Sequence, residues 1–124
     1  MNRYLFLILS FSYSISASAQ TIYYDEACGQ TRKKNATQYA IFTKTDSGYD
    51  ANIYTMAEVR IISGHYNTLP NNLNEGRNGR FTYYFMTGNV SSVRMYLNNL
   101  RTGLWKEYVY STGGLKTEVH YDHD

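Results

Sequence analysis

The chain has one cysteine, Cys28, and one proline, Pro70, in 124 residues. A single thiol excludes an internal disulfide, which small secreted domains often use to offset a small core. The fold must therefore be stabilised by packing. Cys28 itself is expected to be a partly buried free thiol, because buried unpaired cysteines are common.

Charge is also scarce and mixed in sign. The formal net charge is +2 and falls to +1 when Arg3 is left out, and no basic stripe follows the chain. This excludes the electrostatic signature of nucleic-acid binding. After residue 20 there is no hydrophobic run long enough to span a membrane.

The first residues have the layout of a secretory signal peptide. The cation Arg3 precedes an apolar run over 4–9, and the small residues 17–19 form a cleavage site. Serines at alternate positions from 10 to 16 interrupt the apolar run, which argues against a membrane-spanning helix of about 20 apolar residues. We expect a mature chain that begins at Gln20 and a location in the periplasm, the outer envelope or the extracellular space.

Aromatic residues are abundant, with 14 tyrosines, and glycines punctuate the aromatic stretches. Aromatic residues favour strands, and glycine favours tight turns. No segment repeats apolar residues at helical spacing, and the best helix candidate, 35–40, is expected to form at most one turn. We predict an all-β fold in which consecutive β-hairpin repeats form one twisted antiparallel sheet. Strands are expected near 21–24, 39–45, 49–54, 59–66, 80–86, 90–97, 104–110 and 115–121.

A degenerate repeat organises the second half of the chain. Residues 79–84 align with 103–108 as glycine, any residue, an aromatic residue, any two residues and tyrosine. A glycine-containing turn, an aliphatic residue and a later tyrosine complete each unit. Trp105 and Tyr108 are an odd number of residues apart, so either a bulge separates them or both faces of the sheet carry aromatic rings.

A worn copy of the unit precedes these two, with Asp50 at the aromatic position and Ala57 at the turn glycine. Between the copies, the polar segment 67–79 is predicted to be the longest and most mobile loop. The predicted organisation is a signal peptide over 1–19, a leader with the first strands over 20–47 and hairpin repeats over 48–124. The three repeat units span about 48–66, 79–97 and 103–121.

The last unit reads Gly103-Leu104-Trp105-Lys106-Glu107-Tyr108, then Gly113-Gly114-Leu115-Lys116-Thr117-Glu118, and ends at Tyr121. This pattern resembles the MORN-variant repeat, and the unit that starts at Gly79 fits it with Phe81 in place of tryptophan. The leader also resembles the stretch before such repeats in small secreted bacterial proteins, some of which carry an antitoxin label. The resemblance implies a stack of β-hairpins that acts as a non-enzymatic interaction scaffold.

Candidate catalytic groups are few. Ser63 and His65 bring a hydroxyl and an imidazole close together in the sequence, with no orienting carboxylate nearby. Asp50 with Glu58 is a conceivable carboxylate pair across a hairpin, but solvated strand charges explain these residues more simply. We expect no catalytic residues.

The same reasoning applies to Glu107 with Glu118 and to the C-terminal histidines. His120 and His123 have metal-compatible side chains, but a frayed terminus does not hold four ligands in place. We expect no metal site and no cofactor.

The remaining surface signal consists of tyrosine, tryptophan and arginine, which are enriched at binding hot spots. We favour packing as the role of most of them, because a small β domain needs its aromatic residues for a core. The candidate interaction residues are Tyr84, Arg94, Tyr96, Arg101, Trp105, Tyr108, Tyr110 and Tyr121.

These features together favour a secreted or periplasmic, non-enzymatic β-repeat module for protein interaction or envelope structure. A protein-interaction module should show a free sheet edge or an apolar patch. The first alternative is a carbohydrate-binding module, which should show two or three coplanar aromatic rings on an open face. The second is a small secreted hydrolase, which should gather His65, Asp50 and Glu58 in a pocket.

Overall fold

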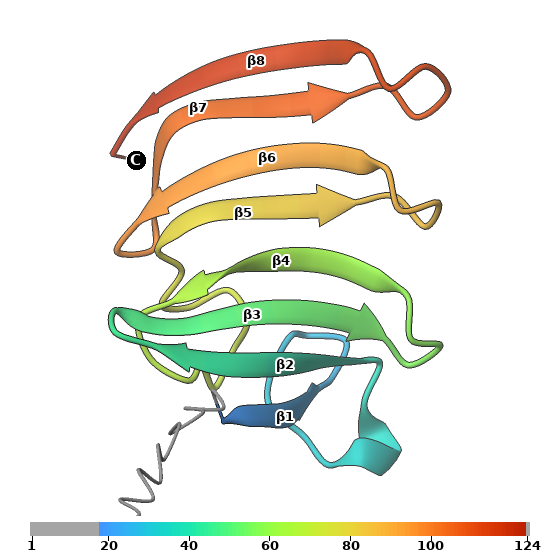
Figure 1. Ribbon diagram of the computed structural model, residues 1–124, viewed down its shortest axis with the longest axis vertical. Coiled ribbons are helices and arrows are strands. Elements are labelled where there is room, and N and C mark those ends of the chain that lie inside the picture. Colours follow the sequence, from blue (N-terminus) through green and yellow to red (C-terminus); the bar gives the residue numbers. More distant parts are fainter. Residues whose placement is uncertain (1–17, 124) are drawn as a thin grey trace, which may run out of the picture.

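The computed structural model describes residues 18–123 and contains one open antiparallel sheet (Figure 1). Its eight strands lie side by side in chain order, so every strand pairs with its neighbours in the sequence. This confirms the all-β fold and its construction from consecutive hairpins. Most of the predicted signal peptide lies outside the described residues. The strands are β1 (Ala19–Tyr24), β2 (Gln38–Thr45), β3 (Gly48–Thr55), β4 (Arg60–Tyr66), β5 (Gly79–Tyr84), β6 (Val90–Leu97), β7 (Leu100–Tyr108) and β8 (Leu115–Asp122).

The predicted strands correspond one to one with the observed strands, with ends that differ by a few residues. The predicted helical turn is present as a 3₁₀ turn, η1 (Lys33–Asn35), slightly before the expected position. It carries two lysines and buries no residue, which explains why it extends no further.

Seven aromatic rings form a ladder across one face of the sheet, which we call the ladder face. Each ring lies 4.7–6.4 Å, centroid to centroid, from the next. Most contacts are edge-to-face, the geometry that aromatic quadrupoles favour. The ladder contains Tyr24, Phe42, Tyr66, Phe81, Tyr96, Trp105 and Tyr121, which come from every strand except β3.

Two small residues allow the ladder to pass over β3 and β4. Ala51 on β3 lies between Phe42 on β2 and Gly64 on β4 in the strand register. A methyl group at Gly64 would approach the Phe81 ring to 2.4 Å, so any residue other than glycine would clash with the ring in this position. As a result, Phe42 meets the Tyr66 ring directly, although their strands are not neighbours.

The segment 67–78 covers the ladder face at the N-terminal end of the sheet. The Tyr24 hydroxyl donates to the Pro70 carbonyl oxygen, and the Tyr66 hydroxyl donates to that of Leu73, each at 2.7 Å. Leu73 is 4% exposed and belongs to the core. Two buried phenols and one leucine therefore attach the predicted loop over 67–79 to the sheet, and its mobility stays a prediction.

A register shift recurs at the same place in three hairpins. It occurs beside Tyr54 on β3, Tyr84 on β5 and Tyr108 on β7. The second sequence alternative holds for the last unit: Tyr108 lies on the side of Leu104, opposite Trp105, and the extra residue of the register shift, Lys116, belongs to β8. The worn copy thus shares its irregularity with the two clearer units.

Candidate interaction surfaces

The cover over the ladder face ends near Tyr96. Arg77, at the end of the covering segment, lies over the Tyr96 ring at 4.0 Å and donates to its hydroxyl at 3.0 Å. The Arg77 Nε also donates to the Asn99 Oδ1 at 2.8 Å, which closes the cover on the β6–β7 turn. Tyr96 is 4% exposed, so this candidate residue belongs to the core and is not accessible to a partner.

Beyond this cover lies a surface that we call the Arg94 surface, which comprises Arg94, Arg101, Trp105, Val119 and Tyr121. The Arg94 guanidinium lies 4.3 Å from the Tyr83 ring centre and 5.3 Å from that of Trp105. Arg101 lies 4.5 Å over Tyr121 in the same way. A guanidinium over an aromatic ring is attracted by the negative face of the ring.

Trp105 is oriented from two sides. Its indole Nε1 donates to the Met95 carbonyl oxygen at 2.9 Å, and its ring meets Tyr96 at 5.2 Å and Tyr121 at 4.7 Å. It is half-buried and packs against the core. A small hollow of about 80 Å³ opens beside it, lined also by Arg94 and Val119.

Burial raises the pKa of the Tyr83 phenol, and the neighbouring Tyr96 acts in the same direction while Arg94 opposes it. The phenol therefore stays protonated at neutral pH. The positive charge of Arg94 is not neutralised by a phenolate beneath it, and within residues 18–123 no carboxylate lies within ion-pair distance of Arg94. Arg94 and Arg101 therefore give this aromatic surface positive charge, and the hollow beside Trp105 also contains Glu107.

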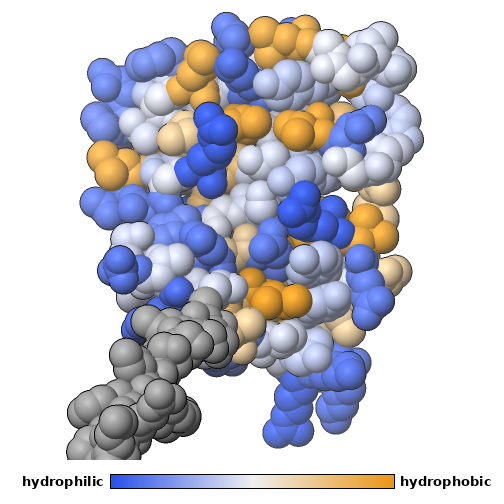
Figure 2. All heavy atoms as spheres, viewed as in Figure 1, coloured by the Kyte–Doolittle hydropathy of each residue, from blue (hydrophilic) through white to orange (hydrophobic). Residues whose placement is uncertain are grey.

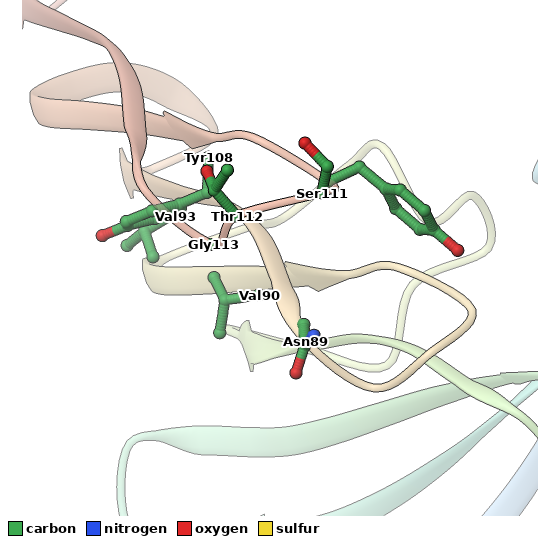
Figure 3. A pocket seen from close by; sticks show the side chains of 8 residues that line it. Asn89, Val90, Val93, Tyr108, Ser111, Thr112 and Gly113 are labelled. Carbon is green, nitrogen blue, oxygen red and sulfur yellow. The ribbon is translucent and has the colours of Figure 1, made fainter.

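The other candidate tyrosines lie elsewhere. Tyr84 lies under Arg60 at 4.4 Å and its hydroxyl is 3.0 Å from the Ser63 Oγ. Tyr108 and the exposed Tyr110 line an open depression of about 580 Å³ between the β5–β6 and β7–β8 turns (Figure 3). The candidate residues therefore form no single site: the structure brings together only Arg94, Arg101, Trp105 and Tyr121, with Tyr96 buried beside them.

Sequence reasoning missed the arginines Arg60 and Arg77, which stack on Tyr84 and Tyr96. Each arginine is well separated in the chain from its ring, so no local pattern identifies the pair. It also missed Val119 as a wall of the hollow. The alternation of 115–121 already placed Val119 on the apolar face of its strand. The strand register places it directly opposite Trp105 and therefore beside the hollow.

His65 lies between a carboxylate and a hydroxyl. Its Nδ1 is 2.8 Å from the Asp50 Oδ1, and its Nε2 is 3.2 Å from the Ser47 Oγ. The expectation of no orienting carboxylate near His65 was wrong, because the β3–β4 register places Asp50 directly opposite. Ser63, its neighbour in sequence, bonds Tyr84 instead.

This cluster lacks the surroundings of a catalytic triad. The adjacent open depression is lined by Asp50 and His65 but not by Ser47, which lies on the β2–β3 turn. The serine that does line this depression is Ser63, whose hydroxyl pairs with Tyr84. Glu58 lies in the β3–β4 turn, at the other end of β3 from Asp50, so the conceivable carboxylate pair does not form.

The second carboxylate pair also does not form. Lys106 faces Glu118, with 3.8 Å between Nζ and Oε1, while Glu107 lies opposite Thr117. Glu107 and Glu118 therefore lie on opposite faces of the hairpin. In the part of the chain that the structure describes, no three histidine, cysteine or acidic side chains gather to hold a metal ion.

The N-terminal strands carry three tyrosines on the face opposite the ladder. Tyr39 and Tyr54 are within 15° of parallel and 5.2 Å apart, and Tyr23 is tilted by 50° to Tyr39. Rings stacked in this way cover part of each other's faces, whereas a sugar platform needs coplanar rings side by side. The carbohydrate-binding alternative stays a prediction.

Most of the exposed large apolar residues belong to the C-terminal half of the chain, where Leu97 and Leu100 are register partners. On the face shown in Figure 2, hydrophobic residues form separate spots between polar ones. No helix within residues 18–123 is long and apolar enough to cross a membrane. Comparison of the chain with protein families, with curated proteins and with solved structures finds no match.

Proposed function

We propose that this chain is an exported, non-enzymatic β-repeat module that binds another protein through the Arg94 surface. One observation carries the proposal: the ladder face is covered from Tyr24 to Tyr96 and uncovered at Trp105 and Tyr121. The same ladder thus serves as a core at one end and presents tryptophan, tyrosine and arginine at the other. These residue types dominate the energetics of protein interfaces.

The charge of the surface favours an acidic partner segment. The guanidinium groups of Arg94 and Arg101 lie over aromatic rings, and these contacts hold each group in place before a partner arrives. A preordered arginine loses little entropy on binding a carboxylate, and planar guanidinium groups suit bidentate pairing. A protein segment with aspartate or glutamate beside an apolar residue fits this surface, because Val119 lines the hollow with Arg94 and supplies an apolar contact.

The predicted signal peptide supports export, and the resemblance to the MORN-variant repeat supports a scaffold without enzymatic activity. The arrangement of the polar groups agrees with that proposal. The cluster around His65 has catalytic residue types, but it lies on the face opposite the ladder, and the depression beside it is not lined by Ser47.

The test is capture from cell-envelope extract by the purified protein, compared with two charge-reversal variants. Arg94→Glu should abolish capture of a specific protein, while Arg32→Glu, at an exposed position beside the 3₁₀ turn, should retain it. Circular dichroism establishes that both variants fold. Capture that is equal for both variants, or binding of a polysaccharide with no protein captured, would overturn the proposal.

A further inference from the structure

Strand β8 (Leu115–Asp122) is the last strand of the sheet and pairs only with β7. Residues 115–120 are all exposed, and among the described residues no strand pairs with its outer edge. The unpaired N–H and C=O groups of such an edge are a template for a further strand. What can occupy the edge depends on the side chains that line it.

Charge alternates in sign along one face of this strand. Lys116 is positive, Glu118 is negative, His120 is positive when protonated and Asp122 is negative. These four side chains lie on the face opposite Trp105, because Val119 is the register partner of Trp105 and Glu118 that of Lys106. A second copy of this strand, running antiparallel to the first, therefore presents the complementary order of side chains.

Antiparallel pairing of two β8 strands about Val119 places each of these four side chains opposite a complementary one. Lys116 then lies opposite Asp122 of the second copy, and Glu118 opposite His120 of the second copy. A two-fold axis repeats each pair, so Lys116 and Asp122 meet opposite charges across the junction and Glu118 meets an imidazole that can donate a hydrogen bond to it. On the ladder side Val119, which is 41% exposed, meets its own symmetry mate.

Other registers of the two strands place like charges opposite each other or leave part of β8 without a strand partner. Parallel pairing in register places each charge opposite the same charge. Antiparallel pairing about Glu118 puts that carboxylate opposite itself and Lys116 opposite His120. Pairing about Thr117 keeps the contact of Lys116 with Glu118 but leaves the last residues of β8 opposite the β7–β8 turn. The charges that discourage unselective edge pairing therefore select one arrangement.

We propose that the β8 edge binds a second copy of this chain as an antiparallel two-fold pair centred on Val119. The two sheets join into one continuous sheet with both ladder faces on the same side. The inference goes beyond the proposed function, because it uses the backbone edge of β8, whereas the protein partner binds the Arg94 surface. It also removes the one fully open edge that the C-terminal hairpin presents.

The experiment measures the mass of the purified protein by sedimentation over a concentration series at low salt. Wild type should approach twice the mass of one chain as concentration rises. Lys116→Glu and Asp122→Lys should each weaken self-association about tenfold, because each places two like-charged pairs across the junction. An equimolar mixture of the two variants should recover it, since Glu at 116 in one chain then faces Lys at 122 in the other. Lys34→Glu, on the exposed 3₁₀ turn, is the charge-matched control.

A wild type that stays monomeric throughout the series overturns the proposal, and so does a mixture no more associated than either variant alone. Recovery in the mixture also shows that both variants are folded. Failure here differs from failure of the proposed function: a dimer that captures no envelope protein refutes the Arg94 surface, whereas a monomer whose capture depends on Arg94 refutes the β8 pairing.

Discussion

The indole ring of Trp105 lies 4.7 Å from the phenol ring of Tyr121, and this contact is the last step of the ladder that begins at Tyr24. Every earlier step is buried on one side by the core or by the segment 67–78, while this step is open to solvent. The last hairpin therefore depends on a few side chains for its attachment to the sheet.

Truncation of Trp105 should test that dependence. Trp105→Ala removes the ring contacts to Tyr96 and Tyr121 and the hydrogen bond to the Met95 carbonyl. Because the ring is half-buried, we expect a loss of about 3 kcal/mol in the free energy of unfolding, at the low end for large aromatic truncations. Urea denaturation measures it, with Tyr110→Ala at an exposed ring as the control. An unchanged midpoint would mean that Trp105 is a binding residue without a packing role.

Gly64 should tolerate no side chain. Gly64→Ala would place a methyl group 2.4 Å from the Phe81 ring, so Phe81 must move and break its contacts with Tyr66 and Tyr96. We expect destabilisation by about 1–3 kcal/mol, as for overpacked cores. Gly29→Ala is the matched control, because its added methyl group meets only the Asp25 carboxylate at an ordinary 3.6 Å. Equal thermal midpoints for the two variants would contradict the close approach of Phe81 to β4.

Stability should fall at alkaline pH. Burial raises the pKa of Tyr66 and of Tyr24 above the ordinary value of 10.0. Above about pH 10 the unfolded chain therefore loses these protons while the folded chain retains them, so the free energy of unfolding decreases as pH rises. The stabilisation is complete below that pH.

Urea midpoints measured from about pH 8 to about pH 11.5 should show this decline. Tyr66→Phe should make the decline shallower, although it lowers stability at neutral pH by leaving the Leu73 carbonyl without its donor. The variant Tyr110→Phe serves as the control. If Tyr66→Phe and wild type decline in parallel, the Tyr66 phenol is not the group responsible.

The cluster around His65 should act on stability and not on catalysis. His65→Ala removes the contacts to Asp50 and to Ser47 that join β4 to the β2–β3 turn. Because Asp50 is 64% exposed, we expect a cost of at most about 1 kcal/mol. Hydrolysis of an activated ester is the second measurement, with Ser47→Ala beside it. A rate above buffer that disappears in Ser47→Ala would contradict the non-enzymatic proposal.

Much of the architecture follows from local patterns. Strict alternation over 115–121 predicts a strand with one charged face, and on β8 Val119 and Tyr121 lie on the face of Trp105, whereas the register shift places Leu115 opposite Tyr108. Glycines and polar turns separate strands that pair with their sequence neighbours, so prediction of the strands also predicts the sheet. The site was less predictable, because Tyr96 and Trp105 are both ladder aromatics, yet only the first lies beneath Arg77.

By itself, the sequence determined the strands, their order and the alternation of charge along the last edge, since these depend on residues close together in the chain. The tertiary structure decided which aromatic residues are core and which are surface. Tyr24 binds the Pro70 carbonyl 46 residues away, and the β3–β4 register brings Asp50 to His65. Such contacts form only when the folded sheet places distant segments together, and no local pattern of residue types encodes where a polar loop will pack.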